Sequence, residues 1–248
     1  MKRIFIANWK MQLLPHEAVN LASELQKRLK EGVRNCEIVL APAHTALAAA
    51  HEVVKGGPLL LCAQDCFWEE RGAYTGEVAA AELRELGCAY VLVGHSERRQ
   101  YLGETDEMVK RKFNKIINSG MRPVLCVGEK LEERRKGKAK EIIRRQLETV
   151  ITGFGDKEKK FVIAYEPVWA IGTGVAANPE EIGEMHAFIR SIVKKFITFD
   201  EKWVRIIYGG SVNAKNIGDF LKVPDTSGAL VGGASLKAEE FEAIVKSR

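Results

Sequence analysis

Three side chains that can transfer protons or hold charge follow short apolar runs of the sequence. Lys10, His95 and Glu166 each come within three residues of the end of such a run. A carboxylate behind a buried strand is desolvated, which raises its pKa toward the value that a general base needs near neutral pH. A histidine can pass a proton at moderate pH, and a lysine can stabilise a developing enediolate. Together the three residue types predict proton abstraction beside a carbonyl group.

Each of these residues alone also has an ordinary structural explanation. A glutamate at a strand end is commonly solvated, a histidine there can be satisfied by backbone groups, and a lone lysine usually belongs to a surface salt bridge. Their combination in one chain, together with a phosphate site, is what favours the catalytic interpretation.

Two glycine pairs indicate that phosphate site. Gly209-Gly210, followed by Ser211, comes after the seventh apolar run, and Gly232-Gly233 comes after the eighth. Glycine lets backbone N–H groups approach an anion, and in α/β barrels the last two strands carry the usual phosphate site. Tight turns alone would explain either pair, but not both at these two positions.

A long segment after Glu166 has the composition of a lid. Residues 167–177 contain Trp169 and two glycines, and Asn178, Pro179 and Glu181 then form the start signal of a helix. A closing loop would exclude water from a reactive intermediate. An ordinary surface loop is the alternative, which the apolar middle of the segment disfavours.

The elements that must position these groups form a regular alternation. Eight short, almost wholly apolar runs are typical of parallel strands buried on both faces. Helical periodicity follows each run, and Gly87 and Gly120 stand where helices should stop. The sequence therefore predicts an α/β fold, a single (β/α)8 TIM barrel domain over residues 1–248. The runs are Ile4 to Ala7, Ile38 to Ala41, Leu59 to Ala63, Tyr90 to Val93, Pro123 to Val127, Phe161 to Tyr165, Val204 to Tyr208 and Ala229 to Val231.

Charge and composition restrict the partners. The chain has 248 residues and a net charge of +5, but its densest basic stretch, Lys130 to Arg145, is interleaved with glutamates, as in a solvated helix face. The N-terminal apolar run is too short for a signal peptide, and no stretch approaches a membrane span. We expect a cytoplasmic protein that binds neither nucleic acid nor membrane.

Cysteine spacing and glycine motifs give no indication of a metal or a cofactor. The five cysteines lack paired metal-ligand spacings, and we expect them to be reduced and mostly buried. No dinucleotide or P-loop fingerprint occurs in the sequence. The expected chemistry needs no cofactor and no metal. The cysteines are Cys36, Cys62, Cys66, Cys88 and Cys126.

Five segments of the chain resemble the signature segments of the triosephosphate isomerase family, in the same order. This resemblance implies an isomerase of glycolysis and gluconeogenesis that interconverts dihydroxyacetone phosphate and D-glyceraldehyde 3-phosphate through an enediolate. Members of this family are themselves standard examples of a neutral catalytic histidine and of loop closure. The segments are Asn8 to Met11, Gly94 to Arg99, Ala164 to Gly174, Tyr208 to Val212 and Leu230 to Ala234.

The resemblance also assigns roles by position. Glu166 is the general base, His95 is the neutral imidazole that moves protons between the two oxygens, and Lys10 stabilises the oxyanion. Supporting roles fall to three groups of residues: Asn8 positions substrate, Ser96 and Glu97 support the site, and Gly172, Ser211, Gly232 and Gly233 bind the phosphate.

The segment 64–77 resembles the loop with which family members enter a neighbouring subunit near Lys10, and a homodimer is therefore implied. The aromatic side chains of this segment also suggest an interface, although a self-packed loop is the alternative. The chain departs from the family's pattern in two places. Residues 175–177, Val-Ala-Ala, replace a hinge that commonly begins with lysine, and Gln12 and Asp65 stand where many members have asparagine.

Two rival functions remain open at this point. Another phosphate-binding barrel, such as a sugar-phosphate isomerase of histidine or tryptophan synthesis, would carry its acid and base on different strands. A catalytically silent barrel could act as a binding partner, and sequence alone does not separate it from an enzyme. The retention of Lys10, His95 and Glu166 argues against both.

Overall fold

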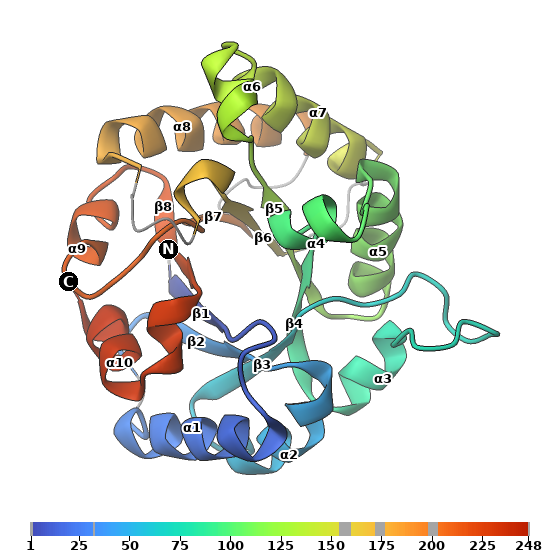
Figure 1. Ribbon diagram of the computed structural model, residues 1–248, viewed down its shortest axis with the longest axis vertical. Helices are drawn as coiled ribbons and strands as arrows, with labels where there is room; N and C mark the ends of the chain where they lie inside the picture. The colour runs from blue at the N-terminus through green and yellow to red at the C-terminus, as the bar shows by residue number, and fades with distance from the viewer. Residues whose placement is uncertain (1, 32, 154–159, 172–176, 198–202, 248) are drawn as a thin grey trace.

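The computed structural model describes residues 2–31, 33–153, 160–171, 177–197 and 203–247. Eight parallel strands pair in sequence order and close into a barrel, with β8 against β1 (Figure 1). Every apolar run that the sequence analysis identified lies within one of them, which confirms the strand predictions and the barrel. The strands are β1 (Arg3–Asn8), β2 (Cys36–Ala41), β3 (Leu59–Ala63), β4 (Cys88–Val93), β5 (Arg122–Val127), β6 (Phe161–Tyr165), β7 (Val204–Tyr208) and β8 (Thr226–Val231).

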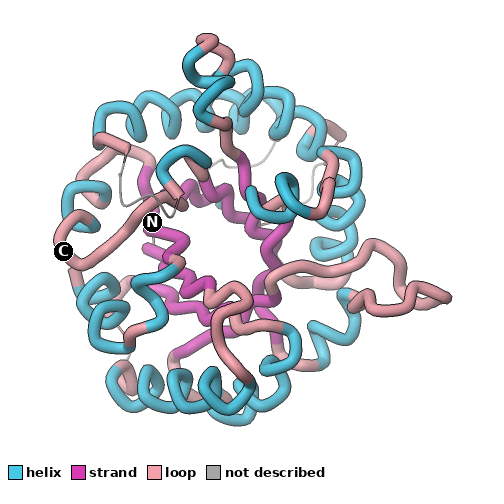
Figure 2. Tube along the Cα trace, in the orientation of Figure 1, coloured by secondary structure: helices cyan, strands magenta, loops and turns pink. Residues whose placement is uncertain are grey.

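The helices form a ring around the strands (Figure 2). The predicted start of α8 is confirmed, because the Asn178 side chain accepts the Glu181 N–H and the Glu181 carboxylate accepts the Asn178 N–H. Gly87 and Gly120, at φ 77° and 76°, end α3 and α5. The helices are α1 (Pro15–Arg28), α2 (Leu47–Val54), α3 (Ala80–Glu85), α4 (Ser96–Tyr101), α5 (Asp106–Asn118), α6 (Leu131–Arg135), α7 (Ala139–Ile151), α8 (Pro179–Phe196), α9 (Ile217–Phe220) and α10 (Ala238–Lys246), with short 3-10 turns η1 (His44–Ala46), η2 (Val168–Ala170) and η4 (Gly233–Leu236).

The apolar core has two layers, one inside the barrel and one between strands and helices. Along β1, Ile4 and Ile6 belong to the inner cluster, whereas Phe5 and Ala7 belong to the outer one. Successive strand side chains point to opposite faces, so a strand with both faces covered must be apolar at every position. Polar side chains are therefore found mainly where the strands end.

A polar cluster closes the end of the barrel where the strands begin. The Tyr90 hydroxyl donates to the Glu37 carboxylate, Arg205 donates to the same carboxylate at 2.8 Å, and Arg122 donates to the Tyr90 hydroxyl at 2.8 Å. Burial by itself would raise the pKa of the Glu37 carboxyl, but Tyr90 and Arg205 outweigh burial, and the pKa lies below its usual value. The opposite end is left for a functional site.

The cysteines are free, as predicted, and all five lie in the described residues. Four are buried and Cys36 is half-buried, and burial raises the pKa of Cys66 to about 12. A thiol with so high a pKa is a poor nucleophile near neutral pH. Within the described ranges, no helix is both long and apolar enough to cross a membrane.

One histidine is enclosed by the outer layer of the core. His186, on α8, is fully buried, and its Nδ1 lies 2.8 Å from Thr226 Oγ1. Its ring packs edge-on against Tyr165, with 6.0 Å between the ring centroids. Burial, reinforced by the nearby charge of Arg190, lowers the pKa of His186 to about 3.

We expect His186 to make the free energy of unfolding depend on pH. The unfolded chain protonates this histidine as pH falls below 6.5, whereas the folded chain does so only near pH 3. The unfolded state binds more protons in between, so stability is complete above pH 6.5 and is lost toward pH 3, by up to ~1.4 kcal/mol per pH unit. In chemical denaturation at pH 7 to 4, His186→Gln should flatten this dependence and the exposed His16→Gln should not. An unchanged slope in His186→Gln would contradict the assignment.

Candidate active site

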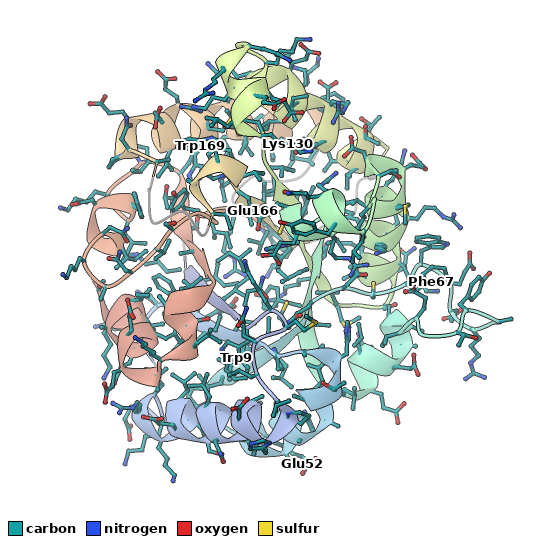
Figure 3. The ribbon with its side chains drawn as sticks, viewed as in Figure 1. Trp9, Glu52, Phe67, Lys130, Glu166 and Trp169 are labelled. Carbon is teal, nitrogen blue, oxygen red and sulfur yellow. The ribbon has the colours of Figure 1, made fainter. Side chains whose placement is uncertain are left out.

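A pocket of about 260 Å³ opens at the carboxyl ends of the strands. It collects side chains from β1, β4, β6, β7 and β8 and the segments that follow them, and Figure 3 places Glu166 inside the ring of helices. Gly172 lies outside the described residues. The other predicted catalytic and substrate-binding residues all line this pocket: Asn8, Lys10, His95, Glu166, Ser211, Gly232 and Gly233.

Lys10 enters the pocket from an unusual backbone conformation. Its φ is 51°, in the left-handed region that non-glycine residues rarely adopt. The Lys10 N–H donates to Asn8 Oδ1 at 3.1 Å, and the Lys10 ammonium contacts the Glu97 carboxylate at 2.5 Å. The ammonium is therefore held at a defined place on the pocket wall.

His95 is the N-cap residue of α4, and one hydrogen bond determines which ring nitrogen carries its proton. The Glu97 backbone N–H donates to His95 Nδ1 at 3.2 Å. An accepting Nδ1 carries no proton, so this contact assigns the proton of a neutral imidazole to Nε2. Nε2 lies 3.1 Å from Glu166 Oε1. The ring thus presents a donor toward the centre of the pocket.

Glu166 is almost completely enclosed, with 1% of its surface exposed, which confirms the predicted desolvation. Its Oε2 accepts the Ser96 backbone N–H at 2.9 Å. Among the described residues, its Oε1 has no aligned hydrogen bond, although His95 is close. One oxygen is bound while the other remains unsatisfied, an arrangement that leaves the carboxylate able to accept a proton from a ligand in the pocket.

Both predicted glycine pairs line the pocket, Gly209-Gly210 beside Glu166 and Gly232-Gly233 beside Lys10. A side chain on Gly232 would stand 3.6 Å from Lys10 Cε, and nothing lies within 4 Å of the position a Gly233 side chain would take. The Ser211 hydroxyl donates to the Ala170 carbonyl at 2.6 Å. Exposed backbone N–H groups in such a wall can approach an anion closely.

Comparison with known proteins places this site in a family. A profile described as triosephosphate isomerase matches residues 3–248. The chain belongs to the triosephosphate isomerase family. The triosephosphate isomerase of Geobacter metallireducens is 46% identical over 244 residues, 98% of this chain and 97% of that one, and the enzyme of Dictyoglomus turgidum is 46% identical over 251 residues, 99% of each. The crystal structure of triosephosphate isomerase from Bartonella henselae superposes with a TM-score of 0.89 at 33% identity, over 98% of both chains.

Membership of this family directs attention to the segment after Glu166. Trp169 lies in η2, and its Nε1 donates to the fully buried Glu129 at 3.0 Å. The Tyr165 hydroxyl donates to the same carboxylate, and Arg134 covers the Trp169 ring at 4.8 Å. This end of the predicted lid is therefore tied to the barrel.

At its other end the Ala177 N–H donates to the Tyr208 hydroxyl at 3.2 Å. Residues 172–176 lie outside the described residues, and the predictions for Gly172, Val175 and Ala176 fall there.

Glu129 is an anchoring residue that the sequence analysis missed. It directly precedes the stretch from Lys130 to Arg145, whose charge pattern indicates a solvated helix face. Its position two residues after the end of β5 was the available signal, because polar groups at strand ends face the site in such barrels. Across the described part of the chain, no group of three or more histidine, cysteine or carboxylate side chains is placed to hold a metal ion.

We expect Gly209→Ala to slow the isomerase reaction because it displaces the Glu166 carboxylate. The added methyl group would stand 2.9 Å from Glu166 Cγ and 3.3 Å from the Tyr165 carbonyl oxygen, so the carboxylate must shift. Displacing a catalytic group by about 1 Å costs roughly 100-fold in rate. Steady-state kinetics should find kcat reduced, while Gly218→Ala, which meets no atom within 4 Å, should keep wild-type rates. Equal rates in the two variants would show that a side chain at position 209 does not displace the Glu166 carboxylate.

Proposed function

We propose that this chain, as a single (β/α)8 barrel domain, interconverts dihydroxyacetone phosphate and D-glyceraldehyde 3-phosphate with Glu166 as its general base. The observation that carries this proposal is the convergence of Lys10, His95 and Glu166 in one pocket. A base, a neutral proton donor and a fixed cation are the groups that an enediolate intermediate requires.

The phosphate is bound at the part of the pocket lined by the two glycine pairs, called here the glycine wall. Backbone N–H groups near Ser211, Gly232 and Gly233 supply hydrogen bonds without adding a positive side chain, and Gly172 is proposed to add another. A phosphate there directs the carbonyl end of a three-carbon substrate toward His95 and toward Lys10, which lies beside Gly232. Asn8, whose side chain holds the Lys10 backbone, lies beside that end.

The proton transfers balance without a cofactor. Glu166 takes the proton from one carbon, and the electron pair moves onto the neighbouring carbonyl oxygen, where Lys10 and the His95 Nε2–H stabilise it. His95 then donates its proton to that oxygen and recovers one from the adjacent hydroxyl. Glu166 returns its proton to the second carbon. The Ser96 N–H holds Oε2 of the base and leaves Oε1 for the proton transfer, while Glu97 fixes Lys10 and the His95 tautomer.

We expect Glu166→Gln to abolish most turnover and to spare the binding of a substrate-like phosphate. The amide keeps the shape of the side chain but does not accept the carbon-bound proton, and the base acts chiefly in the transition state. A fall of about 10³-fold or more in kcat is expected. The measurement is coupled-enzyme kinetics on the purified variant, with phosphate affinity by calorimetry. Near-normal turnover would exclude Glu166 as the base.

The same assay separates the rival functions. A sugar-phosphate isomerase of another pathway would turn over a longer substrate and leave the triose phosphates unchanged, and a silent barrel would bind phosphate without turnover. Lys10, His95 and Glu166 line the same pocket as the two glycine pairs, and this arrangement supports the triose phosphate reaction.

We also propose that two copies of the chain form a homodimer through residues 64–77. The segment between β3 and α3 projects beyond the helix ring, and Figure 3 places Phe67 on it, away from Glu166 (Figure 1). Phe67, Trp68 and Tyr74 pack together there, with ring centroids 4.1 and 4.7 Å apart. A rigid aromatic projection of this kind suits insertion into a second molecule.

Four exposed apolar side chains on the segments that follow β1 and β4 are the surface on which we propose that this segment docks, called here the apolar patch. Met11 is 93% exposed and Tyr101 is 72% exposed, and Leu14 and Leu102 are also exposed. Met11 adjoins Lys10 in sequence, and Tyr101 lies on the same helix as Glu97. A partner's projecting segment seated on this patch would cover apolar surface next to the Lys10–Glu97 pair, so dimer formation and activity would be coupled.

We expect Thr75→Arg to produce monomers with reduced activity. Thr75 is exposed near Tyr74 on the projecting segment, and a guanidinium there would be desolvated on insertion into an apolar interface. Analytical ultracentrifugation gives the mass, and kinetics gives the activity. The matched control is Thr152→Arg. Thr152 is also exposed, but it lies at the end of α7 and not in the projecting segment. An intact dimer for Thr75→Arg would count against this interface.

A further inference from the structure

Gln64 is a polar residue at the end of β3, and the proposed mechanism gives it no role. It follows the last residue of β3 and is half-buried. Its side-chain Nε2 donates to the Lys10 carbonyl and to the Ala41 carbonyl, both at 2.9 Å. One amide group therefore ties the segment after β1 to the end of β2.

The first of these bonds acts on the strained residue. A left-handed backbone is unfavourable for a non-glycine residue and persists only when its surroundings hold it. At Lys10 the N–H is held by the Asn8 side chain and the C=O is held by Gln64. The two peptide groups that flank the Lys10 Cα are thus fixed from both sides.

The backbone of Lys10 controls where its charge lies. A lysine side chain is long and flexible, and its ammonium is a point charge without directional geometry. Glu97 holds the ammonium at 2.5 Å, but both side chains are partly exposed, at 25% and 39%. An exposed ion pair alone gives little positional restraint. A fixed origin for the side chain is the second restraint, and Gln64 supplies it.

Gln64 is itself held by the residue that follows it. The Asp65 carboxylate accepts two bonds from the buried Lys112, at 2.9 and 2.7 Å, and contacts Arg98 at 2.8 Å. Lys112 also contacts the buried Glu104, which balances two carboxylates against two cations. Arg98 is the neighbour of Glu97 in sequence. The network therefore locks the segment that holds the Lys10 backbone to the segment that holds the Lys10 ammonium.

We propose that Gln64 is a positioning residue that sets the location of the Lys10 ammonium through the Lys10 carbonyl. This rests on the proposed function, in which Lys10 stabilises the oxyanion. Gln64 contacts no reacting atom, and its effect passes through Lys10 alone.

The first test compares Gln64→Met with Gln26→Met. Methionine keeps the length of the side chain and removes both donors; Gln26, half-buried on α1, controls for the loss of an amide elsewhere. We expect kcat/KM to fall roughly tenfold to a hundredfold for Gln64→Met only. Affinity for 2-phosphoglycolate, whose carboxylate mimics the enediolate, should fall with it, while affinity for inorganic phosphate should not. Equal losses for both ligands would indicate general damage and overturn the proposal.

The second test asks whether the effect requires Lys10. In a Lys10→Gly background, where the ammonium is absent, Gln64→Met should cost no more than about twofold. The proposal would be overturned if the loss of log(kcat/KM) caused by Gln64→Met in the Lys10→Gly background were at least half of the loss that it causes in the wild-type background. If the wild-type chain itself does not isomerise triose phosphates, the proposed function fails, whereas an active wild type with a fully active Gln64→Met overturns only the role of Gln64.

A second variant covers the case in which Gln64→Met does not fold. Gln64→Glu keeps the shape but sets a carboxylate against two carbonyl oxygens, and its protonated form regains one donor. Its deficit relative to the wild type should shrink as pH falls. A deficit that does not change with pH would overturn the proposal.

Discussion

The closure of the barrel between β8 and β1 is the contact on which the site depends. Gly228 pairs with Ile4 at this seam, and a side chain on Gly228 would lie 1.8 Å from the Ile4 carbonyl oxygen. Only glycine lets the two backbones approach so closely, and its φ of 143° suits no other residue well. Without this closure, Lys10 beyond β1 would not face Gly232 beyond β8. The cation and the phosphate wall are neighbours only because the sheet has no edge.

Closure also explains why a few polar groups are enough to form the site. Both faces of each strand are covered by apolar side chains, so the two ends of the barrel are where a side chain can be polar and still point inward, and one of these ends is the mouth. Glu166 is buried there against β5 and β7, since side chains on Gly128 or Gly209 would collide with it. A low-dielectric wall strengthens every charge interaction inside the pocket, including those of Lys10 and His95 with a developing oxyanion.

The sequence predicted the parts of this structure that depend on local pattern. Strand runs, the Asn178 cap and the polar residues that close the strands all follow from spacing and residue type, and each lies where the sequence analysis put it. It did not predict Glu129 as the anchor of Trp169, because a charged stretch resembles a solvated helix until its partners are known. The left-handed backbone of Lys10 was equally hidden, since long-range bonds from Asn8 and Gln64 hold it there.

Asp65 illustrates how a departure from the family's pattern can be read only in three dimensions. The resemblance set it at a subunit contact in place of an asparagine, yet its side chain is 8% exposed and its carboxylate contacts Lys112 and Arg98 within the same chain. A neutral side chain there would leave Glu104 alone against two buried or half-buried cations, and an uncompensated buried charge is costly. The carboxylate thus neutralises the network that supports Gln64 and Glu97. In this chain the residues behind the site are constrained by charge balance as firmly as the residues in front of it are constrained by chemistry.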